Sequence, residues 1–287
     1  MAKTWTAITI TGAAELADSL SSFLIDQGAP GLQTEDLGDL VRLTAHFCEP
    51  PPVEVVEAYC RALPAAFPGV AAPQVRFESV ADAAWAESWK EHFPPIVVGE
   101  RLFVHPPWTS DVPAGRIAIR IDPGMAFGTG QHATTRGCLE LLEEAMRSIH
   151  VGRVLDIGTG SGILAIAAAK LGATSVCAVD TDPDACRVAI ENAALNEVSE
   201  QIQVFDSLQA AQGTFDVVVA NLFASQLVEL AQPIRERVAA GGWAIGSGIL
   251  LEEAPKVIDA WCDAGLELQA RRLAGEWVTV GFRCKLD

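Results

Sequence analysis

Val154-Leu155-Asp156-Ile157-Gly158-Thr159-Gly160-Ser161-Gly162 is the stretch that decides the fold of this 287-residue chain. The apolar residues before Gly158 predict the end of a buried strand. The glycines at alternate positions predict a tight turn where a ligand can approach bare backbone. Residues 163–170 predict a helix that Ser161 caps and that ends before Gly172. A strand, a glycine turn and a helix in this order are typical of nucleotide-binding folds.

The following strand supports this interpretation. Residues 175–180 are apolar up to Asp180, so a second buried strand ends on a carboxylate. An acid about 20 residues after the first glycine is at the spacing that reaches ribose hydroxyls. Gly158 and Gly160 with Asp180 therefore predict a site for an adenosine-containing ligand.

Strand and helix patterns continue to alternate towards the C-terminus. We expect strands at residues 201–206, 215–222 and 243–247, helices at 185–195, 227–239 and 252–264, and a closing hairpin at 266–283. Alternation of this kind predicts a doubly wound α/β fold with a mostly parallel sheet. Asp206 ends one strand, where it could face an adenine amino group, and Asn221 lies at the end of the next.

Residues 1–80 predict a separate small α+β domain. Their strand and helix patterns follow the order βαββαβ, which is the ferredoxin-like arrangement. The segment holds four basic and ten acidic residues and no cluster that suggests chemistry, so we expect it to hold a partner. Residues 81–95 predict a linker helix whose aromatic stripe of Trp85, Trp89 and Phe93 packs on a domain.

Composition limits the possible partners. The formal net charge is −17 and the sequence pI is about 4.6, which argues against direct, sequence-specific nucleic-acid binding. A basic protein partner is favoured, although acidity can also serve solubility alone. The seven cysteines are scattered without zinc spacing, so we expect no metal site and a reducing, cytoplasmic location. We expect neither a signal peptide nor a membrane-spanning segment, and we expect a monomer.

A second stretch with site character precedes the glycine turn. Asp122-Pro123-Gly124-Met125-Ala126-Phe127-Gly128-Thr129-Gly130-Gln131-His132-Ala133-Thr134-Thr135 is rich in glycine and polar residues and leads into a helix. Loops placed between a strand and a helix often line sites, although they can also be simple connectors. The hydroxyls of Thr134 and Thr135 together with His132 favour a role in a site.

The chain resembles a known enzyme family in several of these stretches. The glycine spacing 158-x-160-x-162, tighter than that of dinucleotide sites, resembles class I methyltransferases that bind S-adenosylmethionine. The loop 122–135 resembles the signature loop of the ribosomal protein L11 methyltransferases (PrmA type). Trp89-Lys90, Pro106-Pro107-Trp108 and Ala220-Asn221-Leu222 add to this resemblance, which spans nearly the whole chain. A short extension near residues 148–150 departs from it.

The resemblance implies a seven-stranded, Rossmann-like methyltransferase domain at residues 96–287 behind a substrate-recognition domain at 1–80. It implies methylation of lysine side chains, and of the N-terminal α-amine, of a basic ribosomal protein. S-adenosylmethionine would be the methyl donor. By the same match, Thr135, Gly158, Asp180 and Asn221 are cofactor-site positions.

Chemistry refines these roles. The amide of Asn221 can accept an amine N–H and direct its lone pair, which makes Asn221 the candidate catalytic residue. His132 is either a base or a structural hydrogen-bonding residue. Phe127 and Trp108 either line the pocket and favour a methylated ammonium by cation–π contact, or have only a packing role. The alternatives are a methyltransferase for another protein or small amine, and a nucleotide-binding protein without catalytic activity.

Overall fold

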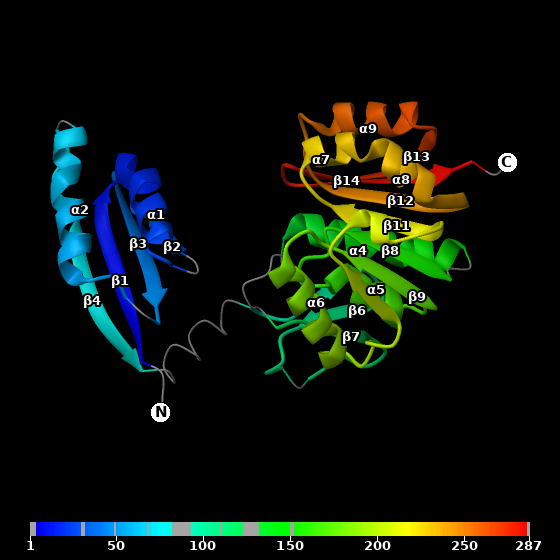
Figure 1. Ribbon diagram of the computed structural model, residues 1–287, viewed down its shortest axis with the longest axis horizontal. Helices are drawn as coiled ribbons and strands as arrows, with labels where there is room; N and C mark the ends of the chain where they lie inside the picture. Colours follow the sequence, from blue (N-terminus) through cyan, green and yellow to red (C-terminus); the bar gives the residue numbers. More distant parts are fainter. Residues whose placement is uncertain are drawn as a thin grey trace. The chain divides into compact units, whose positions relative to one another are not determined.

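A seven-stranded sheet carries the glycine turn at the end of its third strand. The computed structural model describes residues 4–29, 32–48, 50–67, 69–81, 93–109, 111–122, 132–149 and 152–285. Most of the predicted linker helix and of the signature loop lies outside these residues. The chain divides into two compact units, Met1–His92 and Phe93–Asp287 (Figure 1).

The first unit has the element order βαββαβ that the sequence pattern predicts. Its elements are β1 (Thr4–Ala13), the short η1 (Ala14–Leu16), α1 (Ala17–Asp26), β2 (Leu32–Asp36), β3 (Leu40–Phe47), α2 (Val53–Ala66) and β4 (Gln74–Ala81). The strands form an antiparallel sheet in the order β2-β3-β1-β4. Alternate apolar residues of β1 and β3 join those of the two helices in one core.

The second unit begins with a small sheet of its own. Strands β5 (Ile96–Val98), β6 (Leu102–His105) and β7 (Ile117–Arg120) lie in that order, and β5 and β6 form an antiparallel hairpin. Strand β7 pairs in parallel with β6. Apolar residues of these strands pack with α4 (Ala133–Ser148) and α5 (Ile163–Lys170).

The main sheet of the second unit has the order β10-β9-β8-β11-β12-β14-β13. Its parallel strands are β8 (Arg153–Ile157), β9 (Ser175–Val179), β10 (Ile202–Phe205), β11 (Phe215–Asn221) and β12 (Val238–Leu250). Strands β13 (Leu266–Ala274) and β14 (Trp277–Cys284) add the antiparallel hairpin. Since the chain runs outward through β8, β9 and β10 and returns at β11, the strand order reverses between β8 and β11. Ligands of open α/β sheets bind beside such a reversal.

Helices cover both faces of this sheet. Alternate strand residues such as Val154 and Val217 join the core under α4, α5 and α6 (Pro183–Leu195). Their neighbours Leu155 and Val218 join the core under α7 (Ala224–Glu229), α8 (Ala231–Arg237) and α9 (Ala254–Asp263). Figure 1 shows α7 and α9 on the opposite side of the sheet from α5 and α6. The doubly wound α/β architecture is therefore confirmed.

One predicted helix is wrong in its bounds. The segment 227–239 is two short helices, α7 and α8, that meet at Leu230. A continuous helix would need an N–H from Pro233 for the carbonyl of Glu229, and proline has none. Strand β12 begins at Val238, which is earlier than predicted, and it runs through Gly242. A Cβ on Gly242 would lie 2.8 Å from the Asp216 carbonyl oxygen, so a larger residue would not fit there.

Candidate functional site

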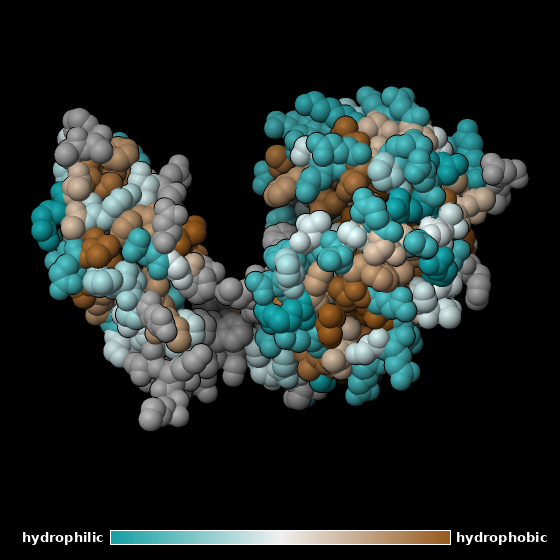
Figure 2. Space-filling model, viewed as in Figure 1, coloured by the Kyte–Doolittle hydropathy of each residue, from teal (hydrophilic) through white to brown (hydrophobic). Residues whose placement is uncertain are grey.

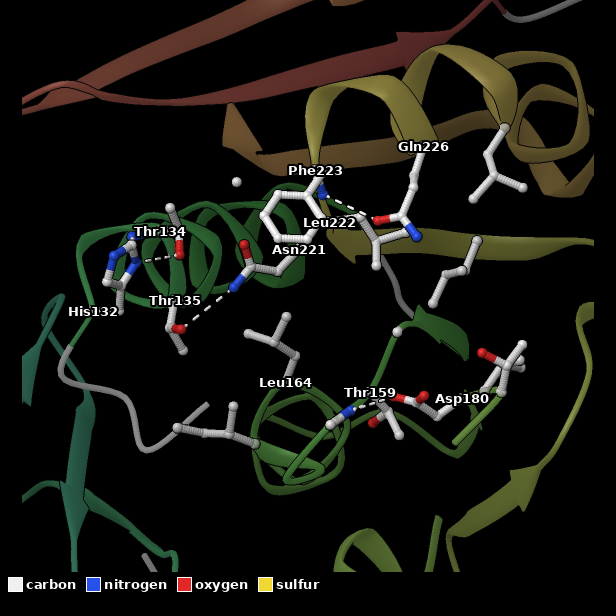
Figure 3. A pocket seen from close by; sticks show the side chains of 18 of the residues that line it. His132, Thr134, Thr135, Thr159, Leu164, Asp180, Asn221, Leu222, Phe223 and Gln226 are labelled. Atoms are coloured by element: carbon white, nitrogen blue, oxygen red, sulfur yellow. Dashed lines mark hydrogen bonds between the residues drawn. The ribbon is translucent and has the colours of Figure 1, made fainter. Parts of the chain in front are cut away.

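A cavity of about 660 Å³ opens where the strand order reverses (Figure 3). A volume of this size suits a small-molecule ligand of cofactor dimensions. Asp180 is the only carboxylate among its described lining residues, which include no Lys or Arg. The lining is His132, Thr134, Thr135, Ile157, Gly158, Thr159, Gly160, Ile163, Leu164, Val179, Asp180, Thr181, Leu208, Asn221, Leu222, Phe223, Gln226, Leu230, Gly248 and Trp277.

The glycine turn forms one wall of the cavity. The N–H groups of Gly158 and Thr159 both donate to the carbonyl of Val179, at 2.8 and 3.0 Å, which fixes the turn against β9. Gly158 has φ +72°, and a Cβ there would lie 2.4 Å from the Leu222 Cδ2 atom. The turn therefore needs glycine both for its backbone conformation and for the close approach of Leu222.

The prediction that Ser161 caps α5 is wrong. Gly162, in a left-handed conformation with φ +81°, is the N-cap residue, and no side chain caps the helix there. The chain must turn sharply from β8 into α5, and a glycine adopts the positive φ that this turn requires. Ser161 is buried, and its carbonyl oxygen accepts from the Asn192 Nδ2 at 2.8 Å.

Asp180 lies half-buried at the end of β9 and faces the glycine turn. Its Oδ2 accepts from the N–H of Gly160 at 2.9 Å, and its Oδ1 accepts from the N–H of Asp182 at 3.1 Å. A carboxylate has about four lone-pair sites, so two acceptor positions remain for a ligand in the cavity. Asp180 thus both anchors the turn and can accept hydrogen bonds from ligand hydroxyls.

A second carboxyl group lies beneath the turn, inside the protein. Asp156 is fully buried, and its Oδ2 accepts from Thr159 Oγ1 at 2.7 Å and from the N–H of Ala165 at 3.2 Å. Its Oδ1 has no hydrogen-bond partner among the residues that the structure describes. Burial raises the pKa of Asp156 to about 7, and the charge of Asp180 adds to the rise, while the bonds from Thr159 and Ala165 oppose it. Near neutral pH, Asp156 is therefore divided between its neutral and charged forms.

Asn221 and Thr135 meet on the other side of the cavity. The Asn221 Nδ2 donates to Thr135 Oγ1 at 3.4 Å, although the two residues are 86 positions apart. A Cβ on Gly137 would lie 2.1 Å from Thr279 Oγ1, so this glycine lets the first turns of α4 approach β14 closely. This packing brings Thr135 to Asn221 and leaves the Asn221 side-chain oxygen available as an acceptor.

His132 begins α4 and acts as its N-cap. Its Nδ1 accepts from the N–H of Thr134 at 3.4 Å and lies 2.8 Å from Thr134 Oγ1. Its ring also meets Trp277 edge to face, with centroids 5.0 Å apart. The Nδ1 atom of His132 therefore holds the first turn of α4, and a role of His132 as a base stays a prediction.

The structure brings together five of the predicted site residues, since Thr135, Gly158, Gly160, Asp180 and Asn221 all line the cavity. Asp206 is exposed and is not among the lining residues, so a contact with adenine stays a prediction. Phe127 lies outside the described residues. Trp108, half-buried, is described but does not line the cavity.

Several lining residues were missed by sequence reasoning. Leu222, Phe223 and Gln226 follow Asn221 directly, and their position after a parallel strand was the signal that could have identified them. Trp277 and Leu208 gave no local signal, because an antiparallel hairpin and a short 3-10 helix bring them to the cavity.

The described ranges contain no group of three or more His, Cys, Asp or Glu side chains that could hold a metal ion. No helix within those ranges is long and apolar enough to cross a membrane.

A family model and two similar relatives carry the same family name. The family model "Ribosomal protein L11 methyltransferase (PrmA)" matches residues 4–285. A ribosomal protein L11 methyltransferase of Pelobacter propionicus is 41% identical over 304 residues, covering 99% of this chain and 98% of the relative. One from Trichlorobacter lovleyi is 40% identical over 302 residues, covering 99% of each chain.

A similar solved structure is named for the same activity as these relatives. The crystal structure of a ribosomal protein L11 methylase from Lactobacillus delbrueckii subsp. bulgaricus is 35% identical, with a TM-score of 0.62. The match covers 67% of this chain and 98% of that one.

Proposed function

Since the chain belongs to the ribosomal protein L11 methyltransferase (PrmA) family, we propose that it transfers methyl groups from S-adenosylmethionine to ribosomal protein L11. The acceptors are lysine side chains and the N-terminal α-amine. The observation that carries this proposal is the single cavity that the glycine turn and Asp180 line together with Asn221.

The residues of the cavity fit S-adenosylmethionine. Asp180 offers acceptor positions for ribose hydroxyls, and the backbone of the turn from Gly158 to Gly160 leaves room for a closely bound ligand. Leu208 and Leu230 provide an apolar wall suited to a flat adenine ring. When bound, S-adenosylmethionine supplies an electrophilic methyl group on a positively charged sulfonium.

The acceptor amine must arrive without its proton. Lysine has an ordinary pKa of about 10.4, so deprotonation at pH 7 costs about 4–5 kcal/mol. The largely apolar lining disfavours the ammonium form and reduces this cost. Asn221 can accept an N–H of the neutral amine and orient its lone pair, and orientation of this kind is a large part of catalysis in general.

His132 need not act as a base in this scheme. Its Nδ1 holds the first turn of α4 through Thr134, so its contribution is to keep Thr135 beside Asn221. Deprotonation of the amine by bulk water before it enters the cavity is sufficient, and the rate should then rise with pH.

We further propose that the first unit is a ferredoxin-like domain that docks the basic substrate. The charge of this unit supports docking of a basic protein, because positions 1–80 hold ten acidic and four basic residues. On α2, the exposed residues Glu54 and Glu57 are close in sequence to Val53 and Val55, which are 43% and 42% exposed. Figure 2 shows hydrophilic and hydrophobic residues mixed over α2. The expected cytoplasmic location suits a ribosomal substrate.

Labelled methyl transfer tests the proposed function. The protein is incubated with S-adenosylmethionine carrying a labelled methyl group and with total ribosomal protein and RNA from a strain that lacks the enzyme. We expect label in one small basic protein, identified as L11, with a rate that falls at high salt because the charges of the docking surface are screened. Label in RNA alone, or in no ribosomal protein, would refute the proposal.

A further inference from the structure

One aromatic side chain beside Asn221 is exposed at the mouth of the cavity. Phe223 lines the cavity and is 73% exposed, the highest exposure among the large hydrophobic residues of the described part of the chain. It is also the only aromatic residue in that exposed group. Phe223 lies two residues after Asn221, and both line the cavity shown in Figure 3.

The backbone that carries Phe223 is fixed at both ends. The N–H of Leu222 donates to the carbonyl of Ser247 at 3.0 Å, and the N–H of Phe223 donates to Gln226 Oε1 at 3.3 Å. Leu222 is wedged between two glycines, since a Cβ on Gly248 would lie 2.2 Å from the Leu222 carbonyl oxygen and one on Gly158 2.4 Å from its side chain. The exposure of Phe223 is therefore built into a tightly held turn.

A second aromatic side chain lines the same cavity. Trp277 lines it and is held edge to face against His132. An amine that reaches Asn221 thus enters an apolar, aromatic surrounding. A lysine side chain brings a flexible four-carbon stem behind its amine, and such stems pack favourably on apolar surfaces. An N-terminal α-amine is attached directly to the backbone and has no stem to pack.

We propose that Phe223 determines acceptor specificity by packing against the aliphatic stem of a substrate lysine, and so favours lysine side chains over the N-terminal α-amine. This inference rests on the proposed function and names the acceptor class that the site prefers. The stem contact would hold the lysine amine at Asn221, while the α-amine depends on contacts elsewhere in the docked substrate.

The test measures the ratio of the two methylation rates on one substrate. Wild type, Phe223→Ala, Phe223→Leu and the control Val228→Ala are each incubated with unmethylated L11 and S-adenosylmethionine, and peptides are quantified by mass spectrometry. Val228 is 38% exposed on α7 and is not among the residues that line the cavity, so its substitution controls for a change in local stability.

We expect Phe223→Ala to lower the ratio of lysine to α-amine methylation about tenfold, a loss typical of one apolar contact in a specificity pocket. Phe223→Leu should restore most of the ratio, and Val228→Ala should leave it unchanged. An unchanged ratio in Phe223→Ala would overturn this inference while leaving the proposed function intact. Absence of methyl transfer by the wild-type protein would overturn both.

Discussion

Replacing Asp180 by asparagine should weaken binding of S-adenosylmethionine about ten- to a hundredfold. The two carboxylate oxygens already accept from the N–H groups of Gly160 and Asp182, and each oxygen has a second lone pair for a ribose hydroxyl. Asparagine keeps one acceptor oxygen and places an NH₂ group in the position of the other. At least one charge-assisted hydrogen bond to the ribose is lost, which is worth about 1.5–3 kcal/mol.

Asp182→Asn is the matched control for this experiment. Asp182 lies two residues further on, is exposed and is not among the residues that line the cavity. Its Oδ1 caps α6 by accepting from the N–H of Asp184 at 2.9 Å, and asparagine caps helices as well as aspartate does. Both variants therefore remove one negative charge, but only Asp180→Asn removes a ligand contact.

Isothermal titration calorimetry with S-adenosylmethionine measures the effect, and thermal unfolding without ligand checks that both variants fold. We expect Asp182→Asn to bind within about twofold of wild type, because an exposed charge outside the site is largely screened. Equal affinities for Asp180→Asn and wild type would refute the assignment of Asp180 as the ribose acceptor. Equal losses in both variants would show that overall charge, and not the hydrogen bond, controls affinity.

Four further changes test other parts of the site. Asn221→Ala should lower kcat about a hundredfold in steady-state methylation, as loss of one positioning donor or acceptor does in other enzymes, and an unchanged kcat would remove Asn221 from catalysis. Gly158→Ala, with φ +72° and Leu222 at 2.4 Å, should lower the melting temperature, while Gly152→Ala, without a positive φ, should lower it less. His132→Asn, which can still cap α4, should keep a methylation rate that rises with pH, whereas loss of that pH dependence would make His132 a base. Burial raises the pKa of Asp156 from 3.8 to about 7, so the contribution of Asp156 to stability should fall as pH rises from about 4 to 7, and the melting temperature of Asp156→Asn relative to wild type should rise over that interval.

The cofactor half of the site could be predicted from the sequence because it is local. The turn at Gly158 and the carboxylate of Asp180 are set by residues that follow one another through a strand, a turn and a helix, and their spacing is visible in the chain. The error at Ser161 came from a choice between two ways to begin a helix. Only the backbone geometry shows that Gly162 takes the cap position.

The acceptor half depends on contacts between distant segments. Asn221 was found because it ends a parallel strand, but its contact with Thr135 comes from the close packing of α4 on β14 at Gly137 and Thr279. Trp277 reaches the cavity only through the antiparallel hairpin. Pairing across a sheet and close helix packing leave little pattern in a single sequence, so these neighbours could not be predicted.

The intact mass of L11 is the most direct test of the central claim. Unmethylated L11 is incubated with S-adenosylmethionine and either the wild-type protein or Asn221→Ala, and its mass is followed with time. We predict that the wild-type protein raises the mass of L11 in steps of one methyl group, that fragmentation maps the added groups to amines, and that Asn221→Ala does so far more slowly. An unchanged mass with the wild-type protein, or methyl groups only on side chains without an amine, would contradict the account.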